Sequence, residues 1–201
     1  MYKLYSIPGS CSMGIHVLLN ELQQDVNIIN INEVDNYSEI NPAMMVPVLE
    51  DGDLQLREGA AIALYLLEKH KDSNLPGGLA EKANFHQHLF FNYATMHPAY
   101  NRLFFAMKNL DGDAQKQMYQ KGASAISALW TLVDKQLATR TFMMGEHPSI
   151  IDYLLCVYAN WGSFFDIDIT LGKNVTRMIK TTIQRPSFQK VLDIERVTFN
   201  I

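Results

Sequence analysis

Cysteine is scarce in this chain of 201 residues, which contains only Cys11 and Cys156. Two cysteines cannot build the disulfide framework of a small secreted protein, so we expect a reducing, cytoplasmic compartment. A basic excess is missing as well, because 17 lysine and arginine residues stand against 21 acidic ones. This balance argues against nucleic acid as a partner, since a surface that binds phosphate backbones needs clustered positive charge.

Long apolar runs are also missing. The most apolar stretch, residues 150–165, contains Asp152 and Asn160 and is too short to cross a bilayer. It therefore predicts a buried helix, and we expect no membrane partner. The N-terminus lacks a basic segment followed by a long apolar run, so we expect no secretory signal.

The first seventy residues alternate between strand-like and helix-like segments. Four segments with alternating or β-branched residues predict strands: 2–7, 26–31, 46–50 and 54–57. An Asp-Gly turn joins the last two strands into a hairpin. Apolar residues at helical spacing predict helices after residue 10 and over 59–70, with a short one possible at 35–41. Ser10 or Ser12 could cap the first helix. This order predicts a mixed sheet with helices against it.

The composition of the chain changes near residue 72. The polar stretch with Pro-Gly-Gly predicts a linker at 72–79, between domains at 1–71 and 80–201. After it, helix-like segments dominate: 80–110, 114–137, 149–164, 175–183 and a last one from 187. Ser149 followed by Asp152 predicts a capping box. The fold class expected is an α/β domain followed by an all-α domain.

Cys11 stands in the sequence PGSCSMG, where a helix begins. A thiol in the first turn of a helix is close to unpaired amides and the positive end of the dipole, which favour thiolate and predict a lowered pKa. There is no Cys-x-x-Cys, so any disulfide of Cys11 would form with another molecule. The alternative is a buried small apolar residue, which is our interpretation of Cys156 in its apolar helix.

Two further features suggest a ligand. Pro47 removes a ladder donor and belongs at a strand start, an edge or a cis turn, which leaves the Val46 backbone able to pair with an extended peptide. Glu58 and Gly59 stand where a strand ends and a helix begins, a place that suits an α-amino acid end group. The alternatives are an ordinary edge proline and an acid that stabilises its own helix.

Four motifs together resemble the glutathione transferase family: PGSCS at 8–12, NPAMMVPVLED at 41–51, LREGAAIALYL at 56–66 and FMMGEHPSIIDYLL at 142–155. The resemblance is closest to the bacterial, cysteine-containing beta-like group. It implies a thioredoxin-like N-terminal domain, an all-α C-terminal domain and a homodimer. It also implies reduced glutathione as co-substrate, with no prosthetic group, and a role in detoxification.

The resemblance assigns roles to residues of the first domain. Pro47 would be a cis-proline, and Val46 would pair its backbone with the cysteinyl part of glutathione. Glu58 and Gly59 would hold the γ-glutamyl end. Cys11 would be the catalytic cysteine, with Ser12 beside the bound thiol. The segment 30–43 departs from the pattern, because it contains no Lys or Arg where such members often place a basic residue near the glycyl carboxylate.

The helical domain would supply the second substrate site. His97, in MHPAY at 96–100, resembles the histidine at the bend of the first long helix and would be a second catalytic residue. The pocket for a hydrophobic electrophile would draw on Tyr100, Phe104, Trp161 and Phe164, although aromatic residues at helical spacing also suit a core. We expect no metal site, because His86 and His88 would point to different faces of a helix.

Two mechanisms and a different class of function stay open. Either the thiol of bound glutathione attacks an electrophile, or Cys11 forms a mixed disulfide in thiol–disulfide exchange. The other class is a glutathione transferase-like binding or regulatory module without catalysis. The presence of Cys11, Pro47, Glu58 and Gly59 favours the enzyme.

Overall fold

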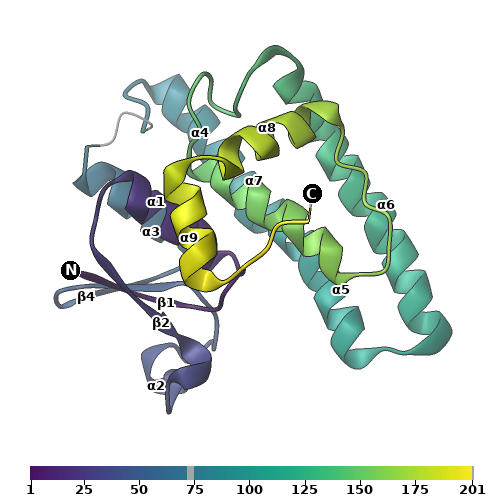
Figure 1. Ribbon diagram of the computed structural model, residues 1–201, viewed down its shortest axis with the longest axis horizontal. Coiled ribbons are helices and arrows are strands. Elements are labelled where there is room, and N and C mark those ends of the chain that lie inside the picture. Colours follow the sequence, from purple (N-terminus) through teal and green to yellow (C-terminus); the bar gives the residue numbers. More distant parts are fainter. Residues whose placement is uncertain (72–74, 201) are drawn as a thin grey trace. The chain divides into compact units, whose positions relative to one another are not determined.

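The computed structural model describes residues 1–71 and 75–200, which form two compact units (Figure 1). The first unit consists of residues 1–86 together with 184–198, and the second consists of residues 87–183 with the residues from Phe199 onward. The last helix therefore groups with the N-terminal sheet, although the sequence suggested a helical domain that runs to residue 201. Part of the expected linker, residues 72–74, lies outside the described residues, so its bounds stay a prediction.

The first unit is built on a four-stranded sheet with the order β2-β1-β3-β4. Its strands are β1 (Tyr2–Ser6), β2 (Val26–Asn30), β3 (Val48–Asp51) and β4 (Leu54–Arg57). β2 is parallel to β1, whereas β1 with β3 and β3 with β4 are antiparallel. Leu4 pairs with Ile28 on one side and Leu49 on the other, and both leucines are fully buried. The predicted hairpin is present, with Gly52 at φ +61° in its turn.

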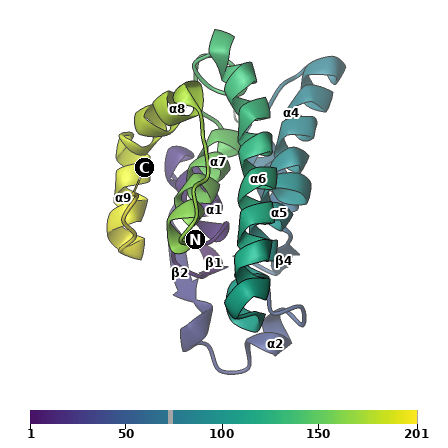
Figure 2. The same ribbon diagram turned by 90° about the vertical axis from the view of Figure 1, so that its right-hand side faces the viewer.

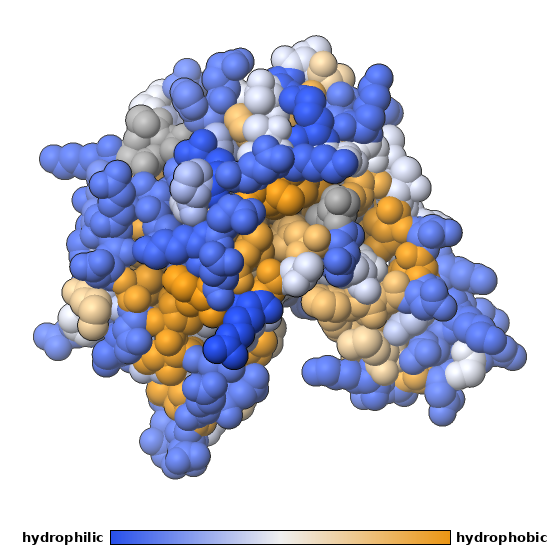
Figure 3. Space-filling model, in the orientation of Figure 1, coloured by the Kyte–Doolittle hydropathy of each residue, from blue (hydrophilic) through white to orange (hydrophobic). Residues whose placement is uncertain are grey.

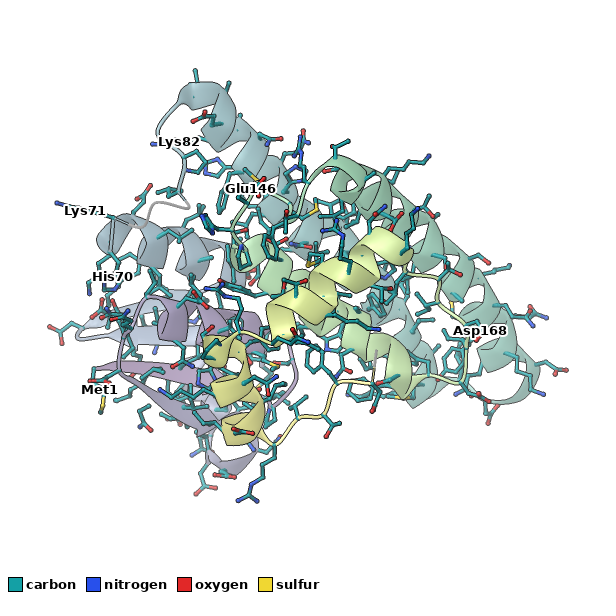
Figure 4. All side chains as sticks on the ribbon, turned by 45° about the horizontal axis from the view of Figure 1, so that its top comes forward. Met1, His70, Lys71, Lys82, Glu146 and Asp168 are labelled. Atoms are coloured by element: carbon teal, nitrogen blue, oxygen red, sulfur yellow. The ribbon has the colours of Figure 1, made fainter. Side chains whose placement is uncertain are left out.

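Helices cover both faces of this sheet. α1 (Ser12–Glu21) packs against α3 (Gly59–Lys69) and against α9 (Pro186–Glu195). The other face is covered by the segment that contains α2 (Tyr37–Ile40), whose Tyr37 packs with Tyr5 and Val48. At the end of α3, His70, which is labelled in Figure 4, is hydrogen-bonded to the hydroxyl of Tyr2 at 2.8 Å. The hydrogen bond joins α3 to the first strand.

The expected serine cap of α1 is wrong. The N-cap residue is Cys11, and no side chain caps the helix. The hydroxyls of Ser10 and Ser12 instead lie 2.7 Å apart, and the Ser12 hydroxyl donates to the carbonyl of Ile7 at 3.4 Å. These local bonds hold the loop before the helix and compete with capping.

α9 is attached to the first unit by charge and by apolar packing. Arg185 donates two hydrogen bonds of 2.9 Å to the carboxylate of Glu21 at the end of α1. Phe188 and Val191 are fully buried. Contacts of this kind join segments far apart in the sequence, and no local pattern predicts them.

The second unit is helical, as expected. The boundary between the units falls within α4 (Leu79–Phe91). The helices that lie wholly in the second unit are α5 (His97–Asn109), α6 (Gly112–Gln136), α7 (Ile150–Trp161) and α8 (Lys173–Ile183). α5 and α6 run along each other (Figure 2). Single 3-10 turns lie at 31–33, 137–139 and 162–164. Among the described residues, no helix has both the length and the apolar character needed to span a membrane.

The expected single helix over 80–110 is interrupted. Residues 92–96 form a π-helical turn between α4 and α5. Pro98 lies in the first turn of α5 and lacks an amide hydrogen, so the carbonyl four residues earlier has no ordinary helical donor. Such turns often occur at functional sites, and this one directly precedes His97.

The capping box of α7 is present. The Ser149 hydroxyl accepts from the amide of Ile151 at 3.3 Å, and the Asp152 carboxylate accepts from the amide of Ser149 at 2.9 Å. Asp152 also accepts from the amide of Met143 at 2.9 Å. Because every residue of α7 is buried, this box begins the central helix of the unit's core.

Candidate functional site

Three segments that carry candidate residues meet where strands of the sheet begin and end. We call this end of the sheet the candidate edge, and the strand directions explain why the segments meet there. β1 and β2 are parallel, so both end at the same edge. β3 is antiparallel to β1 and therefore begins there, and β4 ends there. The loop 7–11, the pair 46–47 and the pair 58–59 consequently share this edge, as does segment 31–45 after β2. Across the edge, their order is segment 31–45, Cys11, Val46 and Glu58.

Cys11 contacts Val46 directly. Its thiol donates to the Val46 carbonyl oxygen at 3.4 Å, and the residue is 6% exposed. Burial raises the pKa of Cys11 to about 12, although the backbone amides of Cys11 and Ser12 act in the opposite direction, and the charge of Glu58 raises it further. The predicted lowering of this pKa is therefore wrong, because desolvation outweighs the helix terminus. At neutral pH Cys11 is a thiol that donates a hydrogen bond.

The Val46–Pro47 peptide bond is cis, as the resemblance implied. Pro47 is buried directly before β3, which is an inner strand, so the proline is at a strand start and not on an edge strand. The preceding Met45 carbonyl accepts from the Tyr37 hydroxyl and the Asn41 side-chain amide, each at 2.8 Å. These two bonds hold the segment that presents the half-buried Val46.

Glu58 has an unusual backbone. It lies at φ 70° and ψ 110°, a conformation that costs a residue with a side chain about 1–3 kcal/mol and that recurs at functional sites. It is the N-cap residue of α3, yet its side chain makes no capping hydrogen bond. A carboxylate at this position still interacts favourably with the helix dipole, so the alternative of an acid that stabilises its own helix stays open beside the ligand role. The exposed carboxylate stands beside Gly59 and the free amides of the first turn.

Ser12 is buried, and its groups are engaged locally. Its amide donates to the Ser10 hydroxyl at 3.3 Å, in addition to the hydroxyl contacts described above. This arrangement makes Ser12 part of the support of the loop that carries Cys11. A direct contact of Ser12 with a ligand stays a prediction.

Glu195, at the end of α9, also supports the Cys11 loop, and the sequence reasoning missed it. One carboxylate oxygen accepts from the amide of Gly9 at 2.9 Å, and the other is 2.8 Å from Nδ1 of His16 on α1. Both side chains are almost completely buried. Gly9 lies at φ +71°, against the side chain of Val197. A charge four residues after Val191, on the apolar face of α9, was the signal that could have found it.

His97 lies at the first position of α5 in the second unit. Its ring makes edge contacts with Trp161 and Tyr158, with centroids 5.2 and 5.7 Å away. Nδ1 is 3.2 Å from the side-chain amide nitrogen of Asn101. Burial lowers the pKa of His97, so the imidazole is neutral at neutral pH and can accept a proton.

The four aromatic residues predicted for an electrophile pocket form one cluster. The ring of Phe104 lies 5.5 Å from that of Trp161 and 6.1 Å from that of Phe164, and Tyr100 lies 5.9 Å from Trp161. Tyr100 is fully buried and accepts a hydrogen bond from Trp130 at 2.9 Å, and Trp161 is buried too. Phe164 is 53% exposed. Phe164 is therefore exposed and Phe104 half-buried, whereas Tyr100 packs in the interior, so the pocket role of all four stays a prediction.

Acidic, histidine and cysteine side chains do not gather into a metal site among residues 1–71 and 75–200. No group of three or more is close enough to hold an ion.

Comparison with known proteins agrees with this fold. The family model of the glutathione S-transferase N-terminal domain matches residues 4–74. A curated relative, glutathione S-transferase GST-4.5 of Xanthomonas campestris, is 29% identical over 175 residues, which cover 84% of this chain and 86% of the relative.

Two solved structures are similar over nearly the whole chain. The bacterial beta class glutathione S-transferase of Sphingomonas chungbukensis has a TM-score of 0.84 at 26% identity, covering 98% of this chain and 100% of that one. A sphingomonad glutathione S-transferase complexed with glutathione has a TM-score of 0.83 at 24% identity, with the same coverage. The expected fold class is thus confirmed, and these relatives belong to the enzyme class that the sequence predicted. The chain has the fold of the glutathione S-transferases, and its residues 4–74 match the N-terminal domain of that family.

Proposed function

We propose that this protein is a glutathione S-transferase that takes reduced glutathione as co-substrate. The observation that carries the proposal is the exposed carboxylate of Glu58, which makes no capping hydrogen bond and lies at the same sheet edge as Val46 and Cys11. This edge offers an acid for an ammonium group, helix amides for a carboxylate and a backbone for an extended peptide. A γ-glutamyl-cysteinyl peptide presents the matching groups: an ammonium group, a carboxylate and an extended backbone.

Each residue has a binding role. The Glu58 carboxylate holds the ammonium group of the γ-glutamyl residue through a charge-assisted hydrogen bond. Gly59 and the first turn of α3 attract its carboxylate, and the missing Cβ of Gly59 lets the ligand approach the backbone. Val46 pairs its main chain with the cysteinyl residue. Cys11, which contacts Val46, is then beside the glutathione thiol.

The raised pKa of Cys11 favours conjugation over exchange through Cys11. At neutral pH the S–H of Cys11 turns from the Val46 carbonyl to the glutathione sulfur and stabilises its thiolate. The glutathione thiol gives its proton to a base, for which the neutral His97 is the candidate, and its sulfur forms a bond with the electrophilic carbon. Either the electrophile's leaving group departs with the electron pair of its bond to carbon, or, in an activated alkene, the π-electron pair moves toward the activating group and the resulting carbanion takes up the proton that the base received. Phe104 and Phe164 are proposed to contact the apolar part of the electrophile.

Calorimetry with glutathione tests the site. We expect Glu58→Gln to weaken binding about 10- to 100-fold, since a charge-assisted bond contributes about 1.5–3 kcal/mol. Asp53→Asn, which removes an exposed acid in the turn between β3 and β4, is the matched control and should bind like the unaltered protein. Equal affinity for glutathione in the Glu58 variant would remove Glu58 from the site.

The binding or regulatory module is the second candidate, and it has a distinct outcome. It predicts glutathione binding that depends on Glu58, with no conjugation of glutathione to any member of a panel of aryl halides and activated alkenes. The enzyme predicts turnover that Glu58→Gln reduces through KM for glutathione. A homodimer and a cytoplasmic location are further parts of this proposal and rest on the family resemblance. Membership of the beta-like group is another part, supported by the similarity to the beta class structure.

A further inference from the structure

The first unit contains a cavity of about 310 Å³ that the glutathione proposal does not use. It lies among α1, α9 and the first half of β2. Because β2 begins at Val26, the cavity extends toward the sheet edge opposite to the one that carries Cys11 and Glu58. Its volume is at the lower end of the range for small-molecule sites, about 300–1,000 Å³, which suits a ligand of amino-acid size.

Three elements each contribute a pair of residues that share a face. His16 and Asn20 are four residues apart on α1, and Lys190 and Ile194 are four apart on α9. Val26 and Ile28 alternate on β2 and therefore point to the same side of the sheet. The pairs converge on the cavity, which makes it a feature of the packed fold. Near α9 and the sheet, Figure 3 shows apolar and hydrophilic surface side by side.

The wall carries two opposite charges that do not neutralise each other. Asp25, immediately before β2, and Lys190, on α9, both line the cavity. Neither takes part in an ion pair within the described part of the chain, where the pairs are Lys3–Glu50, His16–Glu195, Lys69–Asp51 and Arg185–Glu21. An acid and a base that line one cavity, both exposed and without an ion pair between them, suit a ligand that carries both charges.

Asn20 supplies an unsatisfied donor. Its side-chain nitrogen is buried and has no hydrogen-bond partner among the described residues. A buried donor without a partner costs about 1–3 kcal/mol, which a turn of the Asn20 amide toward a ligand acceptor in the cavity would recover. His16 is not free in this way, because Glu195 already engages its Nδ1.

We propose that this cavity binds a free aliphatic α-amino acid. Asp25 accepts from the ammonium group, while Lys190 and the Asn20 amide donate to the carboxylate. The aliphatic side chain packs on Val26, Ile28 and Ile194, of which Ile194 is 49% exposed and would gain cover. The cavity is a second site for an amino-acid group, separate from the one assigned to Glu58 and Gly59.

Leucine is the probe, measured by calorimetry or by saturation-transfer NMR with the full chain. We expect a Kd of about 1 mM or tighter. N-acetyl-leucine lacks the ammonium group and leucinamide lacks the carboxylate, so each should bind at least tenfold more weakly. Asp25→Asn and Lys190→Gln should also weaken leucine binding at least tenfold. The controls Asp53→Asn and Lys180→Gln remove exposed charges elsewhere and should leave it unchanged.

The Glu58 site must be separated from this cavity. Glu58→Gln should bind leucine with unchanged affinity. A weakened affinity for leucine in this variant would place leucine in the clamp at Glu58 and overturn the proposal. So would the absence of leucine binding, an affinity that Asp25→Asn and Lys190→Gln leave unchanged, or equal affinities for leucine and its two masked derivatives.

Discussion

At the scale of single residues, burial decides the chemistry of Cys11. The sequence places a thiol at the start of a helix, and the structure keeps it there as the N-cap residue of α1. The surroundings of the sulfur are not a local property. They include the carbonyl of Val46, which is 35 residues away in the chain and accepts a hydrogen bond from the thiol. The sequence therefore predicts the position of the thiol but not its pKa, because the position is a local property and the pKa depends on packing.

The reactivity of Cys11 tests this conclusion. Since its pKa is raised to about 12, the thiolate fraction should increase about tenfold per pH unit from pH 7 to 10. We expect iodoacetamide to modify Cys11 slowly at pH 7.4 and at a rate that increases with that slope. Peptide mapping after timed labelling gives the rate for each cysteine, and the fully buried Cys156 should be slower at every pH. A rate that levels off below pH 9 would contradict the raised pKa.

At the scale of elements, local signals and long-range supports act together. The box at the start of α7 uses residues three apart, so the sequence alone predicts it. The supports of the Cys11 loop are different. Glu195 reaches Gly9 over 186 residues, and no spacing rule connects them.

Removal of the carboxylate from the box should destabilise the second unit. In Asp152→Ala the buried amides of Met143 and Ser149 lose their acceptor, and we expect a loss of about 2–4 kcal/mol in the free energy of unfolding. Burial raises the pKa of Asp152 to about 6, so urea unfolding should be followed at pH 7.5, where the carboxylate is ionised. Asp113→Ala, in the exposed first turn of α6, is the control and should cost less than about 1 kcal/mol. A loss below 1 kcal/mol in Asp152→Ala would mean that the box is dispensable.

The segment between β2 and Val46 should affect which thiol peptides bind. It reaches the candidate edge beyond Cys11, on the side opposite to Glu58, and would therefore face the glycyl end of glutathione bound as proposed. Residues 31–45 contain Glu33, Asp35 and Glu39, all exposed, and no Lys or Arg. Arg57 approaches the segment, but its guanidinium donates to the Ile40 carbonyl at 2.6 Å and to the side chain of Gln55.

We therefore expect glutathione amide, whose glycyl carboxylate is masked, to bind as tightly as glutathione or up to about fivefold more tightly at low salt. The advantage should disappear at high salt, because these charges are exposed and screened. Competition calorimetry at two salt concentrations measures the ratio. If the amide binds tenfold more weakly, a cation holds the carboxylate, and Arg57→Gln would show whether it is Arg57.

At the scale of the whole molecule, an exposed apolar side chain on α4 bears on the proposed association of two copies. Phe90 on α4 is 49% exposed although its neighbours Phe85 and Leu89 are fully buried. Isolated apolar residues are ordinary on a surface, so this exposure supports association only together with the family resemblance.

Sedimentation equilibrium at micromolar concentration decides whether the proposed homodimer forms. We expect a particle of about twice the chain mass of 22.9 kDa. Phe90→Ser, in an exposed position, should shift the equilibrium toward the monomer if α4 contributes to the interface, and Phe105→Ser, on α5 at 60% exposure, is the comparison. A monomer that persists at the highest concentration would contradict the dimer.

The amino-acid sequence by itself determined the elements, because their signals are local. Alternation, the Asp-Gly turn, helical spacing and the Ser149–Asp152 pair predicted the strands, the hairpin and the central helix of the second unit. The sequence also identified Cys11, Pro47, Glu58 and Gly59 as candidates, through their places at strand and helix ends together with the family resemblance. Only the tertiary structure decided the rest: the protonated state of Cys11, the uncapped Glu58, the burial of Tyr100, the place of α9 in the first unit and the bond from Glu195 to Gly9. Each depends on desolvation or on contacts between distant segments, and neither of these is a property of neighbouring residues.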